Sequence, residues 1–182
     1  EYEKKLTEAW LSQLGIDYQR TDAKVELKVP LTRGDGGVEN PISGGQEVQA
    51  QIKDISQEIG LYSRNDYALS SQLSVQPGLR FDYFSSTKES FALPRFAAKY
   101  KETEAWLWKF GSGIYVQHPE PQEVSEDYGN PDVKSPKAIH LTLGFENDQR
   151  RGQKEGSIYS LNLFHRNYDR LVAQSSAQTV RN

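Results

Sequence analysis

The sequence predicts an all-β chain: an antiparallel meander of long strands that forms part of, or a shortened version of, an outer-membrane-type β-barrel. Three observations lead to this fold class. Apolar and polar residues alternate over long segments, as the two faces of a strand require. No run approaches the roughly 18 consecutive apolar residues of a membrane helix, whereas a spanning strand needs only about 9–11 residues with every second one apolar. The connections between the segments are short in some places and long in others.

Four segments show the alternation most clearly, and we expect long strands near residues 69–84, 105–117, 137–146 and 157–168. In the first of them, Leu79 and Phe81 alternate with Arg80 and Asp82. The segment is long for a strand of a soluble protein, which usually has about 5–6 residues. Charged side chains opposite a continuous apolar face suit a wet barrel interior, because a packed soluble core would exclude them.

Three further segments fit strands less regularly: 10–31, 50–67 and 93–101. In the first, the apolar residues move from even positions such as Tyr18 to odd positions such as Val25, which predicts a bulge or a tight turn near Arg20 to Asp22. Residues 1–14 fit either a strand or a short helix, since Leu6, Trp10 and Leu14 lie four apart. These segments bring the expected number of strands to about seven.

The connections indicate how the strands are arranged. Residues 65–68 and 101–104 read as tight polar turns, whereas 32–47 and 118–137 read as long loops. Short turns at one end and long loops at the other are typical of an outer-membrane barrel. The segment 148–157 departs from this pattern, because it is a long connection at the short-turn end. Trp106 and Trp108 follow a short turn, which favours an aromatic belt at a lipid interface over a soluble core.

Composition narrows the function classes. The chain has 182 residues and a formal charge of −3, so it lacks the basic balance of a nucleic-acid-binding protein. It contains neither cysteine nor methionine, which excludes disulfides and thiolate metal sites. The three histidines, His118, His140 and His165, are too widely spaced for a metal-ligand motif. We expect one domain over residues 1–182, with no enzymatic activity, no cofactor and no metal site.

Six segments together resemble the barrel strands of TonB-dependent outer-membrane receptors. In order, they are GLYSRNDY (60–67), LSVQPGLRFDY (73–83), LPRF (93–96), GIYVQHPE (113–120), YGNPDVK (128–134) and SLNLFHRNY (160–168). The likeness covers roughly residues 55–172. Each segment alone is a weak signal, but their order and spacing make the resemblance fairly specific.

The resemblance implies a portion of a large barrel of about 22 strands in the outer membrane of a Gram-negative bacterium. Such receptors carry a scarce ligand, such as an iron chelate or a vitamin, and their barrels are filled by an N-terminal plug. The sequence shows no plug segment, so we expect the energy-coupling TonB protein to act only through a plug outside these residues. Partners implied are outer-membrane lipid, the small-molecule ligand and, through open strand edges, other copies of the chain.

The pattern also allows a soluble β-sandwich or a small β-barrel that binds a ligand in its own pocket. In that alternative the apolar face is the core, whereas in a membrane barrel it meets lipid. A third possibility is a shortened barrel that closes by pairing its own first and last strands.

The candidate ligand-binding residues are Arg80, Arg95, Tyr115, Gln117 and His118. Strand parity places the first four on the inner face of a barrel, and His118 begins the long loop above them. Arginines there could bind carboxylate or phosphate oxygens, and Tyr115 could stack on an aromatic chelate. The competing interpretation is that the arginines only pair with acids of the lumen such as Asp82, or with a plug.

Overall fold

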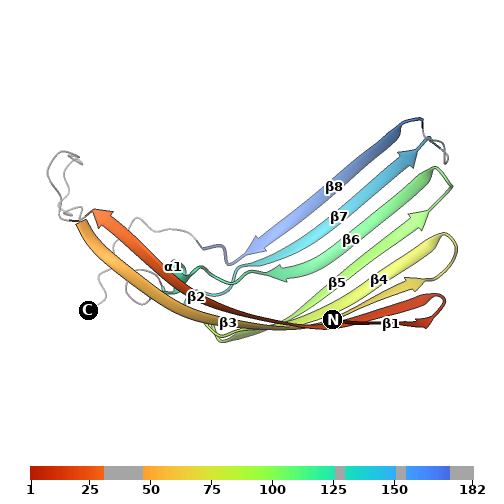
Figure 1. The fold of residues 1–182 in the computed structure, drawn as a ribbon. Helices are drawn as coiled ribbons and strands as arrows, with labels where there is room; N and C mark the ends of the chain where they lie inside the picture. The colour runs from red at the N-terminus through yellow and green to blue at the C-terminus, as the bar shows by residue number, and fades with distance from the viewer. Residues whose placement is uncertain (31–46, 126–129, 151–154, 173–182) are drawn as a thin grey trace.

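The computed structural model describes residues 1–30, 47–125, 130–150 and 155–172. They form one antiparallel sheet of eight strands in sequential order, which Figure 1 shows as a single curved layer. The strands are β1 (Tyr2–Thr7), β2 (Trp10–Pro30), β3 (Glu47–Ala68), β4 (Leu73–Phe84), β5 (Glu89–Lys101), β6 (Trp106–Val116), β7 (Lys137–Asp148) and β8 (Ile158–Asp169). A short helix, α1 (Pro121–Val124), lies in the connection between β6 and β7. The all-β meander predicted from the sequence is confirmed.

No second layer covers the sheet. A β-sandwich would bury one face beneath another sheet, yet among the described residues of the strands only Phe84 and Leu93 have buried large apolar side chains. The soluble-sandwich alternative is therefore wrong. The strand order places β1 and β8 at opposite edges, where they do not pair, so the sheet is not a shortened closed barrel either.

Residues 1–14 form a hairpin, so the helical alternative for them is wrong. β1 pairs with the start of β2, and Thr7 lies opposite Trp10 across the turn. A helix of this length is marginal in water, whereas β2 offers a ready ladder of backbone partners. This hairpin is the reason that the sheet has eight strands where the sequence indicated about seven.

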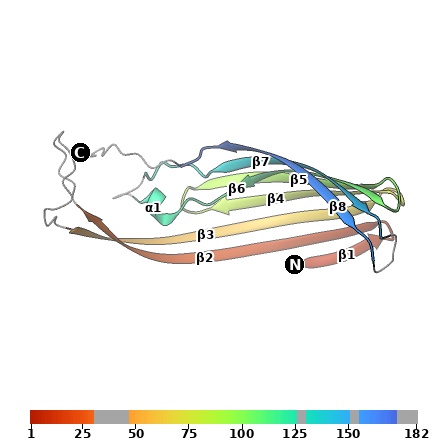
Figure 2. The same ribbon diagram turned by 90° about the horizontal axis from the view of Figure 1, so that it is seen from above.

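The predicted bulge near Arg20 to Asp22 is also wrong. β2 pairs with β3 without interruption from Trp10 opposite Tyr67 to Pro30 opposite Glu47. The change of apolar phase reflects a change of surroundings along a continuous strand. On the face where Ile16 and Tyr18 lie, the next residues are Arg20 and Asp22, which form an ion pair at 3.3 Å. The paired strands β2 and β3 are the longest of the sheet, and Figure 2 shows them from above reaching beyond the ends of the other strands.

Several strand boundaries differ from the sequence expectation. Residues 65–68, expected to be a turn, are the end of β3, and the turn lies at 69–72, so β4 begins at Leu73 and not at 69. The Ser70 hydroxyl accepts hydrogen bonds from the backbone N–H groups of Gln72 and Leu73, which fixes this turn through a polar side chain. β5 begins at Glu89, four residues earlier than the expected segment 93–101.

The ends of the sheet differ in their connections, as expected. We call the end with the turns after β1, β3, β5 and β7 the turn end, and the opposite end the loop end. Two connections are exceptions. Residues 149–157 between β7 and β8 are a long connection at the turn end, as the sequence predicts, and the four residues 85–88 between β4 and β5 form a tight turn at the loop end. Lys88 has a positive φ of 54° in this tight turn. It is the shortest of the three connections at the loop end.

The register assigns each side chain to one of two faces. The apolar face carries exposed large hydrophobic residues, among them Ile16, Leu61, Phe81, Phe96, Phe110, Leu143 and Leu163. The polar face carries residues such as Arg80, Arg95 and His140. Phe81 is 51% exposed and Leu143 is 45% exposed, so the sheet itself does not bury the apolar face. Another apolar medium must cover it.

Candidate ligand-facing surface

A row of basic side chains crosses the polar face from β3 to β8. The register gives the order Arg64, Gly78, Arg95, Gly113, His140 and Arg166. Each neighbouring pair in this row lies directly opposite across a strand pair. Gly78 and Gly113 separate Arg64, Arg95 and His140, so long side chains have room to lie along the wall, whereas His140 and Arg166 are directly opposite each other. The row crosses the middle of β4 and β5 and lies three residues from the loop end of β6, β7 and β8.

The charges in this row are only partly neutralised. Arg64 pairs with Asp66 at 3.6 Å. Within the described residues, Arg95 and Arg166 have no carboxylate partner; each lies over an aromatic ring instead. The Arg166 guanidinium carbon is 5.2 Å from the centre of the Phe164 ring. Arg95 and Arg166 therefore keep hydrogen-bond donors available for an anion.

Arg95, Tyr115 and His140 form a stack at the middle of the row. The Arg95 guanidinium carbon lies 4.7 Å from the centre of the Tyr115 ring, within the range of a cation–π interaction. On the other side, the ring centroids of Tyr115 and His140 are 4.6 Å apart and their planes are tilted by 31°. The three side chains come from β5, β6 and β7 and present a flat aromatic and cationic surface.

Arg80 has a different environment. Its Nε lies 2.7 Å from Oδ1 of Asp82, and its Nη1 lies 2.5 Å from Oδ2 of Asp17 on β2. The side chain is only 27% exposed, and Asp82 is 10% exposed. Arg80 is thus held by two carboxylates of the wall, the pairing with Asp82 that we considered as the competing interpretation. Its charge is compensated, whereas that of Arg95 is not.

A hollow of about 560 Å³ lies on the polar face around these groups. Among its lining residues are Arg80, Arg95 and Tyr115, so the structure brings three of the five candidate residues together. Tyr62, His140 and Thr142 also line it. The sequence alone does not point to His140, because parity does not reveal that Gly113 lies between His140 and Arg95.

Gln117 and His118 do not line this hollow. Gln117 is exposed at the end of β6, where its backbone N–H donates to the carbonyl of Pro136 at 3.0 Å. The His118 ring packs edge-on against Phe84 with centroids 5.5 Å apart, and its Nε2 is 2.6 Å from the Ser86 hydroxyl. His118 therefore fastens the start of the β6–β7 connection to the β4–β5 turn.

The end of the same connection is fastened to β5. Ser135 is fully buried, and its backbone N–H donates to Oε2 of Glu89 at 2.9 Å. Arg170 approaches the other carboxylate oxygen of Glu89 at 3.1 Å. Burial alone raises the pKa of Glu89, but the hydrogen bonds from Ser135 and Thr87, with the charge of Lys134, hold that pKa below its usual value. Glu89 is therefore an ionised anchor at the loop end, beyond the apolar band.

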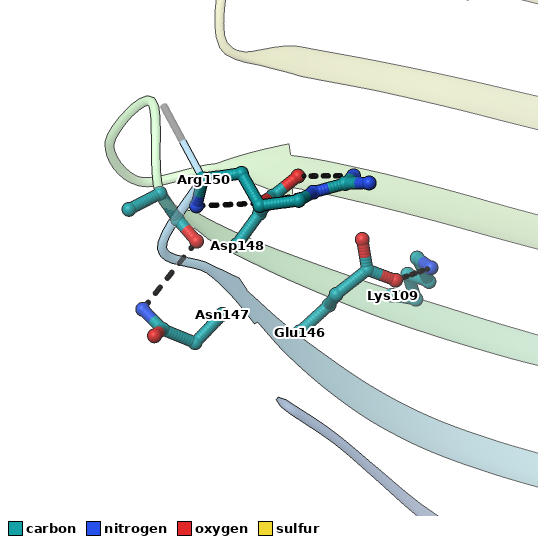
Figure 3. Close-up of polar contacts among 6 residues, drawn as sticks. Lys109, Glu146, Asn147, Asp148 and Arg150 are labelled. Atoms are coloured by element: carbon teal, nitrogen blue, oxygen red, sulfur yellow. Dashed lines mark hydrogen bonds and ion pairs between the residues drawn. The ribbon is translucent and has the colours of Figure 1, made fainter. Parts of the chain in front are cut away.

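The turn end of the polar face carries a separate set of contacts (Figure 3). Lys109 on β6 pairs with Glu146 on β7 at 2.7 Å. Asp148, the last residue of β7, receives hydrogen bonds from the side chain and the backbone of Arg150. These bonds outweigh the effect of desolvation and lower the pKa of Asp148 to about 2. This turn is held by an ion pair that survives moderate acid.

Aromatic residues gather on the apolar face near the turn end. Trp10 and Tyr67 lie with ring centroids 5.1 Å apart, and Trp106 and Trp108 both approach Phe145. The two tryptophans of β6 are 40% and 38% exposed, so they are not core residues. Their location is that of the interfacial belt predicted from the sequence.

The described residues contain no group of three or more histidine, aspartate or glutamate side chains arranged to hold a metal ion. Arginine, tyrosine and histidine side chains line the hollow, and such side chains recognise anions and aromatic groups.

Comparisons with known proteins define the family. The chain matches the model of the TonB dependent receptor-like β-barrel over residues 2–182. No curated protein sequence matches it. Solved structures with the same fold include a mutant of the ferric enterobactin receptor PfeA from Pseudomonas aeruginosa, at 17% identity and a TM-score of 0.63, covering 87% of this chain and 24% of that one.

Two further solved structures have the same fold. The siderophore receptor PirA from Acinetobacter baumannii has 19% identity and a TM-score of 0.65, with 89% of this chain and 25% of that chain covered. The outer membrane transporter YddB from Escherichia coli has 16% identity and a TM-score of 0.61, with 91% and 24% covered. The chain thus spans about a quarter of the length of these proteins. These relatives are receptors and transporters rather than enzymes.

The apolar face that the sheet leaves exposed, the aromatic belt and the charged opposite face are the features of a lipid-facing barrel wall. Together with the family match over nearly the whole chain, they identify it: the chain belongs to the TonB-dependent receptors and forms eight strands of an outer-membrane receptor barrel.

Proposed function

We propose that this segment forms the wall and part of the ligand-facing surface of a receptor that takes up an anionic iron chelate. The observation that carries the proposal is the row of basic groups on the polar face. Among the described residues, Arg95 and Arg166 of this row have no carboxylate partner. The neighbours described as ferric enterobactin and siderophore receptors support this ligand class.

Arg95 and Tyr115 are the proposed centre of the binding surface. A guanidinium donates several hydrogen bonds in one plane and so suits the carboxylate or catecholate oxygens of a chelate. The Tyr115 ring, already stacked between Arg95 and His140, offers a face for an aromatic chelating group. Because these side chains are held in place before binding, less conformational entropy is lost when a ligand arrives.

The other candidate residues have supporting roles in this proposal. Arg80, held by Asp17 and Asp82, shapes the edge of the hollow and adds little net charge to it. Gln117 lies above the hollow at the loop end, and His118 anchors the connection that borders it. The energy-coupling TonB protein acts, in this proposal, through a plug segment and not through these strands.

The test uses the full-length receptor with Arg95→Ala and, as a matched control, Lys99→Ala, which lies four residues further along the same strand on the same face. The probes are ferric enterobactin, which is anionic, and an uncharged ferric trihydroxamate. A hydrogen bond to a charged group contributes about 1.5–3 kcal/mol, so Arg95→Ala should weaken binding of the anionic probe by about 10- to 100-fold. Lys99→Ala should leave the dissociation constant within about twofold of the parent value.

Two results would contradict the proposal. If Arg95→Ala binds the anionic chelate as the parent does, the assigned surface is wrong. If the parent receptor prefers the uncharged probe, the proposed ligand class is wrong.

A further inference from the structure

Several glycines on the polar face are covered by side chains of neighbouring residues. Tyr62 lies over Gly15, Arg80 over Gly60, Tyr115 over Gly113, Thr142 over Gly111 and Asn162 over Gly144. None of these five glycines has a positive φ; Gly156 is the only glycine of the described residues that does. Backbone conformation therefore does not require glycine at these positions. The close approach of a neighbouring side chain does.

Gly113 has the most consequential position of the five. The register places it directly between Arg95 on β5 and His140 on β7. Tyr115, two residues further along β6, points to the same face. Its ring folds back over Gly113, and this brings the ring between the Arg95 guanidinium and the His140 imidazole.

A side chain at position 113 would disturb this arrangement. A Cβ atom there would lie 3.0, 3.1 and 3.2 Å from Cε2, the hydroxyl oxygen and Cζ of Tyr115. These distances are shorter than ordinary contacts between heavy atoms, so the ring would have to shift away from the wall by a few tenths of an ångström. It can move only toward the hollow, because the backbone lies on its other side.

We propose that Gly113 is a positioning residue: the missing side chain lets the Tyr115 ring lie flat between Arg95 and His140 and keeps the hollow open. A glycine inside a strand costs about 0.5–1 kcal/mol of stability relative to alanine. A large side chain laid over a strand glycine compensates part of that cost. The consequence for ligand binding rests on the function proposed above, whereas the position of the ring does not.

The experiment compares Gly113→Ala with Gly144→Ala in the full-length receptor. Gly144 is a matched control, since it is also a strand glycine of the polar face covered by a neighbouring side chain, Asn162. Tyr115, which covers Gly113, lines the hollow, whereas Asn162 does not. The first readout is nitration of Tyr115 by tetranitromethane, measured by peptide mass spectrometry on ligand-free receptor. The second is binding of ferric enterobactin.

We expect Gly113→Ala to increase the nitration rate of Tyr115 at least twofold, because the new side chain pushes the ring away from the wall and loosens its stack with Arg95 and His140. Gly144→Ala should leave that rate unchanged. Binding of ferric enterobactin should fall about tenfold in Gly113→Ala only. An unchanged nitration rate would overturn the inference whatever the binding result. A raised nitration rate with parental binding would support the positioning role and contradict the proposed binding surface.

A second variant covers the case in which Gly113→Ala does not assemble. The double variant Gly113→Ala/Tyr115→Ala removes the ring that the new Cβ would meet. If the inference holds, the double variant assembles at the level of Tyr115→Ala alone. Continued failure to assemble would show that position 113 needs glycine for another reason and would overturn the inference.

Discussion

Arg80 on β4 reaches across β3 to Asp17 on β2, with 2.5 Å between Nη1 and Oδ2. The guanidinium crosses the wall above Gly60, which has no side chain to obstruct it. The same guanidinium is bound to Asp82 on its own strand. One arginine thus joins three strands of the wall through side-chain contacts.

The carboxylates of Asp82 and Asp17 should differ in their contribution to the free energy of unfolding. Asp82→Asn should lower the free energy of unfolding of the barrel by about 1–3 kcal/mol, because Asp82 is 10% exposed and its loss leaves Arg80 poorly compensated. Asp17 is 54% exposed, so Asp17→Asn should cost less than about 1 kcal/mol. Urea unfolding in detergent micelles measures both. Equal losses would mean that burial does not decide the strength of these pairs.

The β7–β8 turn should depend on pH in a defined window. The pKa of Asp148 is about 2 in the folded chain and is lowered from its ordinary value of 3.8. The group therefore contributes stability above about pH 4, and that contribution is lost as the pH falls toward 2. The protection of backbone amides at the ends of β7 and β8, expressed relative to the intrinsic exchange rate at each pH, should fall over this interval.

Asp148→Asn serves as the comparison for that measurement. The variant lacks the titrating carboxylate, so its exchange rates near the turn should be faster than the parent's at pH 5 and should converge with them near pH 2. A parent receptor whose turn loosens only above pH 5 would contradict the assignment.

Glu89 should control the β6–β7 connection. Glu89→Ala removes the acceptor of the Ser135 backbone N–H and the partner of Arg170, so we expect trypsin to cleave at Lys134 severalfold faster than in the parent. Glu102→Ala is the control. It removes an acidic side chain at the turn end, so it should leave this cleavage unchanged. The same rate in Glu89→Ala and the parent would show that other contacts hold the connection.

The sequence predicts the elements of this fold better than its register. Alternation places Leu79, Phe81 and Leu143 on one face because a strand has a period of two residues. Alternation gave a wrong prediction at Arg20 to Asp22, where the apolar residues change from even to odd positions although the strand continues. The pattern of apolar residues depends on what each face of the strand contacts, so it can change without a bulge in the backbone. The hairpin of residues 1–14 was ambiguous because apolar residues four apart fit either a helix or a strand.

The candidate surface was predictable in part for a related reason. Parity placed Arg80, Arg95 and Tyr115 on the polar face, and the structure brings them to one hollow. Parity does not tell which strand positions lie opposite each other, so it could not distinguish the paired Arg80 from Arg95 or add His140 and Arg166. Long-range register depends on turn lengths and on pairing between strands, and neither is encoded in a single segment.

The central claim is that one face of this sheet meets lipid and the other lines a watery lumen. The chain contains no cysteine, so single cysteines introduced along β7 are its only thiols. In receptor embedded in lipid bilayers, a water-soluble maleimide should label cysteines at positions 140, 142 and 144 and should not label those at 139, 141 and 143. Labelling of both sets alike, or of the odd positions alone, would contradict the account.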